Sequence, residues 1–185
     1  MMRRTLLGTL VLAAALLATS CASSSSSAST SPTPSPSPSP VHIASVDPCT
    51  LVTAADASTA LGTPVVNLAS AGGVAIPNEC IYGMSGKDVG MVVFAQVYSD
   101  ASAADAVQPD QIAAALGGQV GVGTSKVVTG IGDKAFEYTA STEQGGGIAI
   151  FVFKANVVIM IVMSPSQDSN AIELVARTAV GRLTS

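Results

Sequence analysis

Two neighbouring segments near the carboxyl-terminal end of the chain contain no polar residue. Residues 148–153 read Ile-Ala-Ile-Phe-Val-Phe, and residues 157–163 read Val-Val-Ile-Met-Ile-Val-Met. Their β-branched and aromatic residues favour strands, and the link Ala155-Asn156 favours a tight hairpin turn in which Asn156 tolerates a positive φ. A sheet with one solvated face would alternate apolar and polar residues. Both faces of this hairpin must therefore be shielded from water.

This two-sided apolar pattern has two explanations. In the first, helices cover one face of the sheet, and a second layer or the curvature of the sheet covers the other, so that the hairpin is simply central. In the second, part of one face lines an apolar cavity for a lipid-like ligand or a groove for a partner. Left uncovered, these segments would be prone to aggregation. The candidate residues for an apolar ligand face are Phe151, Phe153, Ile159 and Ile161.

The remainder of the chain predicts three helical segments and further strands. A short helix begins after Thr53, whose side chain caps the first turn, and ends at Gly62. Residues 102–116 are rich in alanine at helical spacing, and Pro109 divides them into two pieces. The last helix begins at a cap on Ser169 and has a continuous apolar stripe. Further strands are expected at residues 65–68, 80–84, 90–98, 126–129 and 135–140.

The order of these elements, helix, strands, helix, strands, helix, is typical of the α+β class. We expect an antiparallel sheet of about five to seven strands packed against two or three helices. A PsbP-like sandwich is one specific form that this class can take, on fold-level analogy alone.

The amino-terminal residues have the pattern of a lipoprotein signal peptide. Arg3 and Arg4 form a basic region, residues 6–17 form an apolar region, and small residues lead to Cys21. We expect residues 1–20 to be removed and Cys21 to become the lipidated first residue, carrying diacylglycerol and palmitate at the extracytoplasmic face of the cell membrane. The alternatives are an ordinary secreted protein cut nearby and a retained single-span anchor, but so short an apolar run suits a signal better than a membrane span.

A stalk is expected between the lipid and the folded domain. Residues 22–40 are almost entirely Ser, Ala, Thr and Pro. Such a segment has nothing to bury, so residues 21–44 are predicted to be a disordered linker, and an O-glycosylated stalk fits the same composition. The remaining residues, 45–185, have the size of one domain with one core.

The cysteine count predicts a disulfide. With Cys21 assigned to the lipid, Cys49 and Cys80 are the remaining pair in an oxidising export compartment. Closing a loop of about thirty residues would contribute roughly 3 to 4 kcal/mol to stability in the chain-entropy model. The alternatives are two free thiols or half of a metal site.

Charge and histidine content exclude several classes of function. Removal of Arg3 and Arg4 with the signal leaves six basic residues against twelve acidic ones, so no nucleic-acid partner is expected and membrane contact should come through the lipid. The single histidine, His42, lies in the predicted stalk. We therefore expect no catalytic triad, metal or cofactor, and no enzymatic activity. Asp133 and Glu137 share one face of a predicted strand, a spacing that permits a carboxylate pair without implying one.

Several short motifs resemble those of a known group. The chain resembles the small actinobacterial cell-envelope lipoproteins that carry a domain of unknown function, a group that includes the mycobacterial Lpr-type lipoproteins. A departure is Tyr82, where such proteins frequently have Trp. The resemblance implies an α+β domain, an anchored location and the disulfide, and it implies no activity and no catalytic residues. The motifs that carry it are residues 47–53, 60–65, 80–82 and 130–136.

Together these patterns predict a membrane-anchored, extracytoplasmic lipoprotein. Its domain is expected to be a non-enzymatic binding module whose partner is another envelope protein or polymer. The alternative, motivated by the two-sided apolar hairpin, is a carrier or sensor of an apolar small molecule or lipid.

Overall fold

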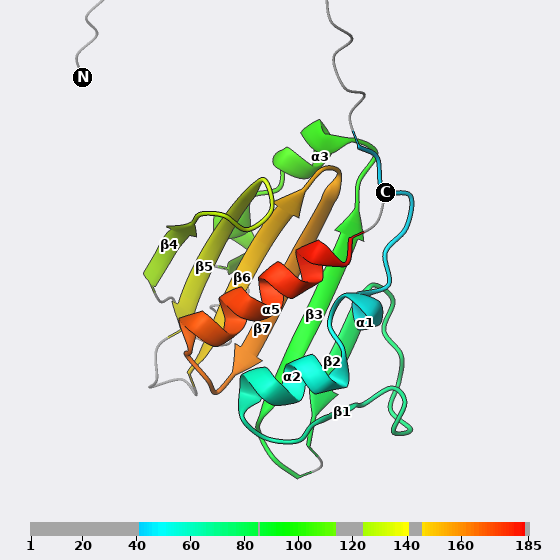
Figure 1. Cartoon of the computed structure of the whole chain (residues 1–185), viewed down its shortest axis with the longest axis vertical. Coiled ribbons are helices and arrows are strands. Elements are labelled where there is room, and N and C mark those ends of the chain that lie inside the picture. Colours follow the sequence, from blue (N-terminus) through cyan, green and yellow to red (C-terminus); the bar gives the residue numbers. More distant parts are fainter. Residues whose placement is uncertain (1–40, 85, 114–123, 141–145, 184–185) are drawn as a thin grey trace, which may run out of the picture. The chain divides into compact units, whose positions relative to one another are not determined.

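A computed structural model describes residues 41–84, 86–113, 124–140 and 146–183 of the chain. Its seven strands form one antiparallel sheet in the order β1-β2-β3-β7-β6-β5-β4 (Figure 1). This arrangement confirms the predicted α+β class. The strands are β1 (Val66–Asn67), β2 (Glu79–Gly83), β3 (Gly90–Val97), β4 (Thr124–Val128), β5 (Lys134–Ala140), β6 (Gly147–Lys154) and β7 (Val157–Ser164). Helices are α1 (Pro48–Leu51), α2 (Ala54–Leu61), α3 (Ala101–Asp105) and α5 (Ser169–Gly181).

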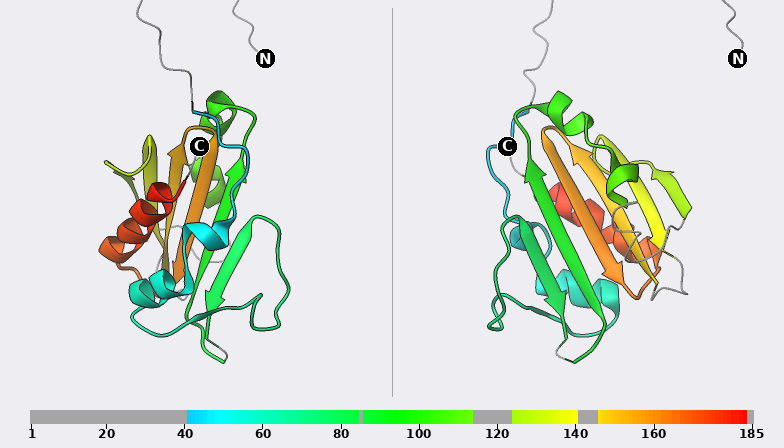
Figure 2. Two further views of the ribbon diagram at one scale, coloured as in Figure 1. Left: turned by 45° about the vertical axis from the view of Figure 1, so that its right-hand side comes forward. Right: turned by 180° about the vertical axis from the view of Figure 1, so that it is seen from behind.

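Helices cover the sheet from two sides. Helices α1, α2 and α5 lie on one face, which we call the α5 face, and α3 lies on the opposite face, the α3 face (Figure 2). Side chains of β6 alternate between the two faces, because Ile150 and Val152 belong to the core under α5, whereas Phe151 and Phe153 belong to a second cluster with Ala104 of α3. All these residues are buried. The hairpin is therefore central, as the first explanation of its pattern predicted: its α5 face is buried throughout, and its α3 face is buried under α3 and half-buried over the rest of its length.

The helix ends follow local side-chain chemistry. At the start of α2, Thr53 and Asp56 form a reciprocal capping box, and Gly62 ends the helix with a φ of 66°. The sequence predicted Ser169 as the cap of α5. In the structure Ser169 is the first residue of the helix, and the cap is Asp168, which accepts hydrogen bonds from two amides of the first turn. A carboxylate accepts hydrogen bonds from these amides, and its negative charge also interacts favourably with the positive end of the helix dipole, which a neutral hydroxyl does not provide.

The alanine-rich segment divides at proline as predicted. Helix α3 ends at Asp105, and residues 109–113 are helical again, with Pro109 at the first position. Proline suits this position because the amide that it lacks has no partner within the helix. The predicted end of this segment, at residue 116, lies outside the described residues.

The turn between β6 and β7 differs from its prediction. The positive φ, 51°, belongs to Ala155 rather than Asn156, and Asp133 Oδ2 accepts a hydrogen bond from the Ala155 amide at 2.7 Å. Asn156 is buried instead, 1% exposed. Its Oδ1 accepts from the Ile43 amide at 2.8 Å, and its Nδ2 donates to the carbonyl oxygens of Ile43 and Tyr98 at 2.9 and 2.8 Å. This asparagine therefore makes long-range contacts in place of a local turn role.

The contact with Asn156 fixes where the chain enters the domain. Ile43 is buried and packs into the core on the α5 face. Packed structure thus includes Ile43, two residues before the predicted boundary at Ser45. The predicted signal peptide, Cys21 and most of the stalk, residues 1–40, lie outside the described residues.

We predict that Asn156→Ala lowers the free energy of unfolding by about 2 to 4 kcal/mol, because three backbone groups, two buried and one part-buried, lose their hydrogen-bond partner. Urea unfolding measures the loss, and hydrogen exchange at the Ile43 amide shows whether the entering segment is released. The matched control is Asn170→Ala at an exposed position, which should change stability by less than about 0.5 kcal/mol. Unchanged exchange at Ile43 would show that Asn156 does not hold this segment.

Candidate binding surface beside the disulfide

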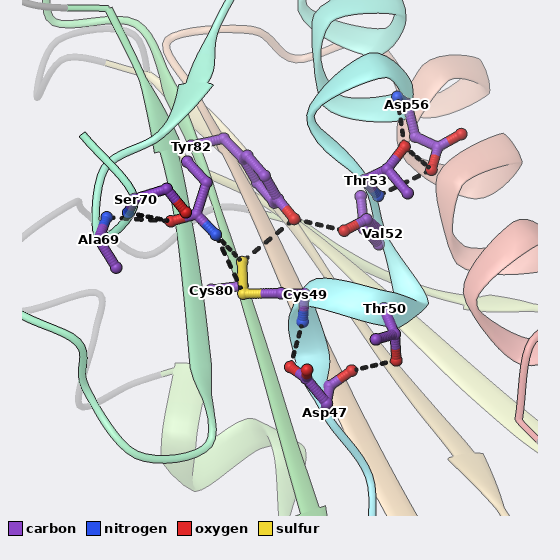
Figure 3. The surroundings of a disulfide bond; sticks show 11 residues. Asp47, Cys49, Thr50, Val52, Thr53, Asp56, Ala69, Ser70, Cys80 and Tyr82 are labelled. Atoms are coloured by element: carbon purple, nitrogen blue, oxygen red, sulfur yellow. Dashed lines mark hydrogen bonds between the residues drawn. A yellow bond between two sulfur atoms is a disulfide. The ribbon is translucent and has the colours of Figure 1, made fainter.

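The Cys49–Cys80 disulfide is present and joins α1 to β2, with a Cα–Cα distance of 5.2 Å. This confirms the predicted pairing. Two polar side chains contact the sulfur atoms, and Figure 3 shows the Tyr82 hydroxyl pointing toward them. Asn67 Nδ2 lies 3.2 Å from each Sγ. The Tyr82 hydroxyl lies 3.1 Å from the Sγ of Cys80 and donates a hydrogen bond to the carbonyl oxygen of Val52. Burial raises the pKa of Tyr82 to about 12, so the hydroxyl remains a donor at neutral pH.

Asn67 also shapes the chain that follows β1. Its Oδ1 accepts hydrogen bonds from the amides of Ala69 and Ser70, at 2.9 and 3.4 Å, as in an Asx turn. One side chain therefore contacts the disulfide through its nitrogen and ends the edge strand through its oxygen. The loop between β1 and β2 begins at a position that the disulfide fixes.

Strand β1 and this loop expose several apolar side chains. The exposed fractions are 86% for Val74, 52% for Val66 and 45% for Ile76. Scattered exposed apolar residues are common, but these lie within eleven residues of sequence, and Val74 and Ile76 line one pocket. We call this region, residues 66–81, the β1-edge surface.

The pocket at the β1-edge surface has a volume of about 210 Å³. Glu79 and Ile81 alternate along β2 with Cys80 and Tyr82, which face the core under α5, so the pocket opens on the α3 face. The loop lies on the side of the sheet away from α5 in Figure 2. Glu79 is the only charged residue in the lining. The lining residues are Leu68, Ala69, Gly73, Val74, Ile76, Glu79 and Ile81.

A second polar cluster joins α2 to the end of α5. The guanidinium of Arg182 binds the carboxylate of Asp56 at 2.5 Å and the carbonyl oxygen of Leu51 at 2.9 Å. Thr53 donates to the same carboxylate from its amide and its hydroxyl, at 2.8 and 2.7 Å. The Arg182 hydrogen bond is the main reason that the pKa of Asp56 falls from 3.8 to about 2. These contacts hold the end of α5 against α1 and α2 on the α5 face.

The four candidate residues for an apolar ligand face do not share a face. Phe151 and Phe153 lie under α3, whereas Ile159 and Ile161 lie in the core under α5. Each is at most 2% exposed, and none lines the pocket described above. The reason is the hairpin register, which pairs Phe151 with Met160 and Phe153 with Val158. All four are core residues in the described part of the chain.

Asp133 and Glu137 are not brought together as a carboxylate pair. Asp133 is exposed and binds Lys154 at 2.8 Å, beside the Ala155 amide. Glu137 is 2% exposed and lies under the start of α5. The two carboxylates therefore contact different elements and do not form a pair.

The burial of Glu137 under α5 is a feature that the sequence analysis did not predict. Its Oε1 accepts from the Ser169 hydroxyl at 2.8 Å and lies 3.1 Å from Lys126 Nζ, while its Oε2 has no hydrogen-bond partner among the described residues. Lys126 also binds Glu173 of α5 at 3.3 Å. The pKa of Lys126 is raised, chiefly by the hydrogen bond to Glu137. The signal in the sequence that could have indicated this burial is a charged residue at a core-facing position of a predicted strand.

Comparison with known proteins gives no relative. No protein-family model matches the sequence, and no curated protein matches it. The resemblance to envelope lipoproteins therefore stays a prediction. Among the helices described, none combines the length and apolar character that crossing a membrane requires. In the same residues, His, Cys, Asp and Glu side chains form no group of three suited to a metal ion.

We predict that Asn67→Ala loosens the β1-edge surface. The Ala69 and Ser70 amides lose their acceptor, so their hydrogen exchange should accelerate and stability should fall by about 1 to 2 kcal/mol. Exchange mass spectrometry over residues 66–81 tests this, with Asn170→Ala as the matched control. Unchanged exchange at residues 69 and 70 would mean that the loop does not depend on Asn67.

We predict that the contribution of the Asp56–Arg182 pair to stability is lost in acid. A carboxylate whose pKa is lowered by folding stabilises the fold above its unfolded pKa of 3.8, and this stabilisation disappears as the pH falls toward 2. The measurement compares urea midpoints of wild type and Arg182→Gln at about pH 6, 4 and 2.5. The difference should be largest at the highest pH and should shrink at the lowest, leaving the part due to the Leu51 contact. A difference that is constant with pH would contradict the assignment.

Proposed function

We propose that the chain is a non-enzymatic lipoprotein of the cell envelope, anchored through Cys21 at the extracytoplasmic face of the cell membrane. Its domain binds another envelope protein through the β1-edge surface. The observation that carries the proposal is the exposed apolar loop around a pocket, held in place by the disulfide and Asn67. Exposed apolar residues grouped around a pocket are typical of interaction sites.

The size of the pocket favours a protein partner over a small-molecule ligand. Sites for drug-sized molecules usually have volumes of about 300 to 1,000 Å³. The pocket here, about 210 Å³, suits one or two side chains. The apolar residues around it, including Val74 and Ile76, continue onto the open surface, as expected for a partner that covers the loop. A carrier of an apolar small molecule is the less favoured alternative, because its four candidate residues are packed core.

The lipoprotein part of the proposal depends on the amino-terminal sequence. The pattern of Arg3, Arg4, the apolar run and Cys21 supports it. The absence of histidine after His42 supports a non-enzymatic role, because triad and zinc chemistry usually need imidazole. An oxidising location is consistent with the Cys49–Cys80 disulfide.

Site-specific photocrosslinking in the cells that make the protein tests the binding surface. A photoreactive residue replaces Val74 in the full chain, and the matched control carries it at Val127, which is 70% exposed on β4 at the other edge of the sheet. We expect a discrete crosslinked envelope protein from position 74 and not from position 127, and its loss in an Ile76→Asp background. Identical products from both positions, or none from position 74, would contradict the proposal.

The same cells test the anchor. Cys21→Ser should abolish incorporation of a labelled fatty acid and move the protein from the membrane fraction to the soluble one. Cys21→Ser protein that still carries the label would exclude Cys21 as the site of lipidation.

A further inference from the structure

We infer that the β1-edge surface binds a segment of a partner protein that inserts an apolar side chain into the pocket and places a lysine or arginine beside it, paired with Glu79. The inference rests on the proposed function and names the chemistry of the partner. Its central observation is a carboxylate in a pocket that is otherwise apolar.

Glu79 has no partner within the described domain. It is half-buried at the start of β2, and no described side chain forms a salt bridge or a hydrogen bond with its carboxylate. Its cross-strand neighbour is Phe94, and the next pair on this face is Ile81 and Val92. A carboxylate against apolar walls is incompletely solvated and interacts more strongly with a cation than one in open water. Glu79 therefore favours a positively charged group at the pocket.

The remaining charges of the domain also favour a cationic partner. Basic residues are few, and most are used internally: Lys126, Lys134, Lys154, Arg177 and Arg182 each pair with Asp or Glu of the same chain. Among the described residues, Lys87 is the one basic side chain outside these pairs. The uncompensated charge on the surface is therefore negative, which attracts basic segments and repels acidic ones.

The apolar part of the pocket defines the second requirement. Its volume of about 210 Å³ suits a branched or aromatic side chain. Half-buried Ile81, Val92 and Phe94 continue the apolar surface from the pocket onto β3. A simple polycation would leave these residues in water, and an apolar acidic segment would bring like charge to Glu79. A segment with both an apolar and a basic residue satisfies both features.

Labelling with defined peptides tests the inference on the full chain in detergent micelles. The chain carries the photoreactive residue at position 74, and the fluorescent probes have the sequences Gly-Lys-Leu-Lys-Gly, Gly-Gln-Leu-Gln-Gly, Gly-Glu-Leu-Glu-Gly and Gly-Lys-Gly-Lys-Gly. We expect the Lys-Leu-Lys peptide to label at about tenfold lower concentration than each of the others. Glu79→Gln should remove most of this preference. Asp88→Asn, which makes the same change of charge at an exposed acidic residue, should retain it.

The outcomes separate the inference from the proposed function. Equal labelling by the three leucine peptides, unaffected by Glu79→Gln, would overturn the cationic partner while leaving an apolar binding surface. Labelling by both lysine peptides alike would overturn the requirement for an apolar side chain. A crosslinked dimer of the chain in place of peptide labelling would identify a second copy as the occupant and overturn the inference. Labelling by no peptide would overturn the inference, and identical cellular products from positions 74 and 127 would overturn the proposed function as well.

Discussion

Burial of the β6–β7 hairpin on both faces is the constraint on which the rest of the fold depends. Each fully buried aliphatic or aromatic side chain contributes about 1.5 to 3 kcal/mol relative to exposure, and this gain requires a layer on each side of the hairpin. Helix α5 supplies Ile172 and Val175 on one side, and α3 supplies Ala104 on the other. The strands next to the hairpin, β3 and β5, are seven or eight residues long, whereas the outermost strands are shorter. The centre of the sheet is therefore used for packing, and surfaces that could serve other purposes lie at its edges.

The two edges are held by side chains as much as by backbone pairing. At one edge, the disulfide and Asn67 hold the two-residue strand β1. At the other, Lys126 of β4 links buried Glu137 to Glu173 of α5. Burying a carboxylate costs free energy that one ion pair does not reliably recover. Glu137 is therefore better understood as fixing the position of β4 against α5 than as a source of stability.

Features that depend on local sequence could be predicted, and those that depend on distant partners could not. Strand positions followed from apolar runs, the Thr53 cap of α2 from its place before the helix, and the disulfide from the cysteine count. The role of Asn156 could not be found because its partner, Ile43, is 113 residues away. The placement of the four candidate ligand residues on two different faces could have been predicted from the sequence. A two-residue turn at Ala155-Asn156 already pairs Phe151 with Met160 rather than with Ile159. Periodicity within each strand alone does not give the register across the hairpin.

The β1-edge surface carries an apolar loop that is exposed and also fixed at its base. A flexible loop loses conformational entropy when a partner orders it, and a loop that is already ordered avoids much of this cost. Asn67 links the loop to the disulfide through one side chain. The disulfide therefore not only reduces the conformational entropy of the unfolded chain but also helps to position this loop. Because the same contact stabilises the edge strand and positions Leu68 and Ala69 at the pocket, loss of the Cys49–Cys80 bond should loosen the β1-edge surface before it unfolds the sheet.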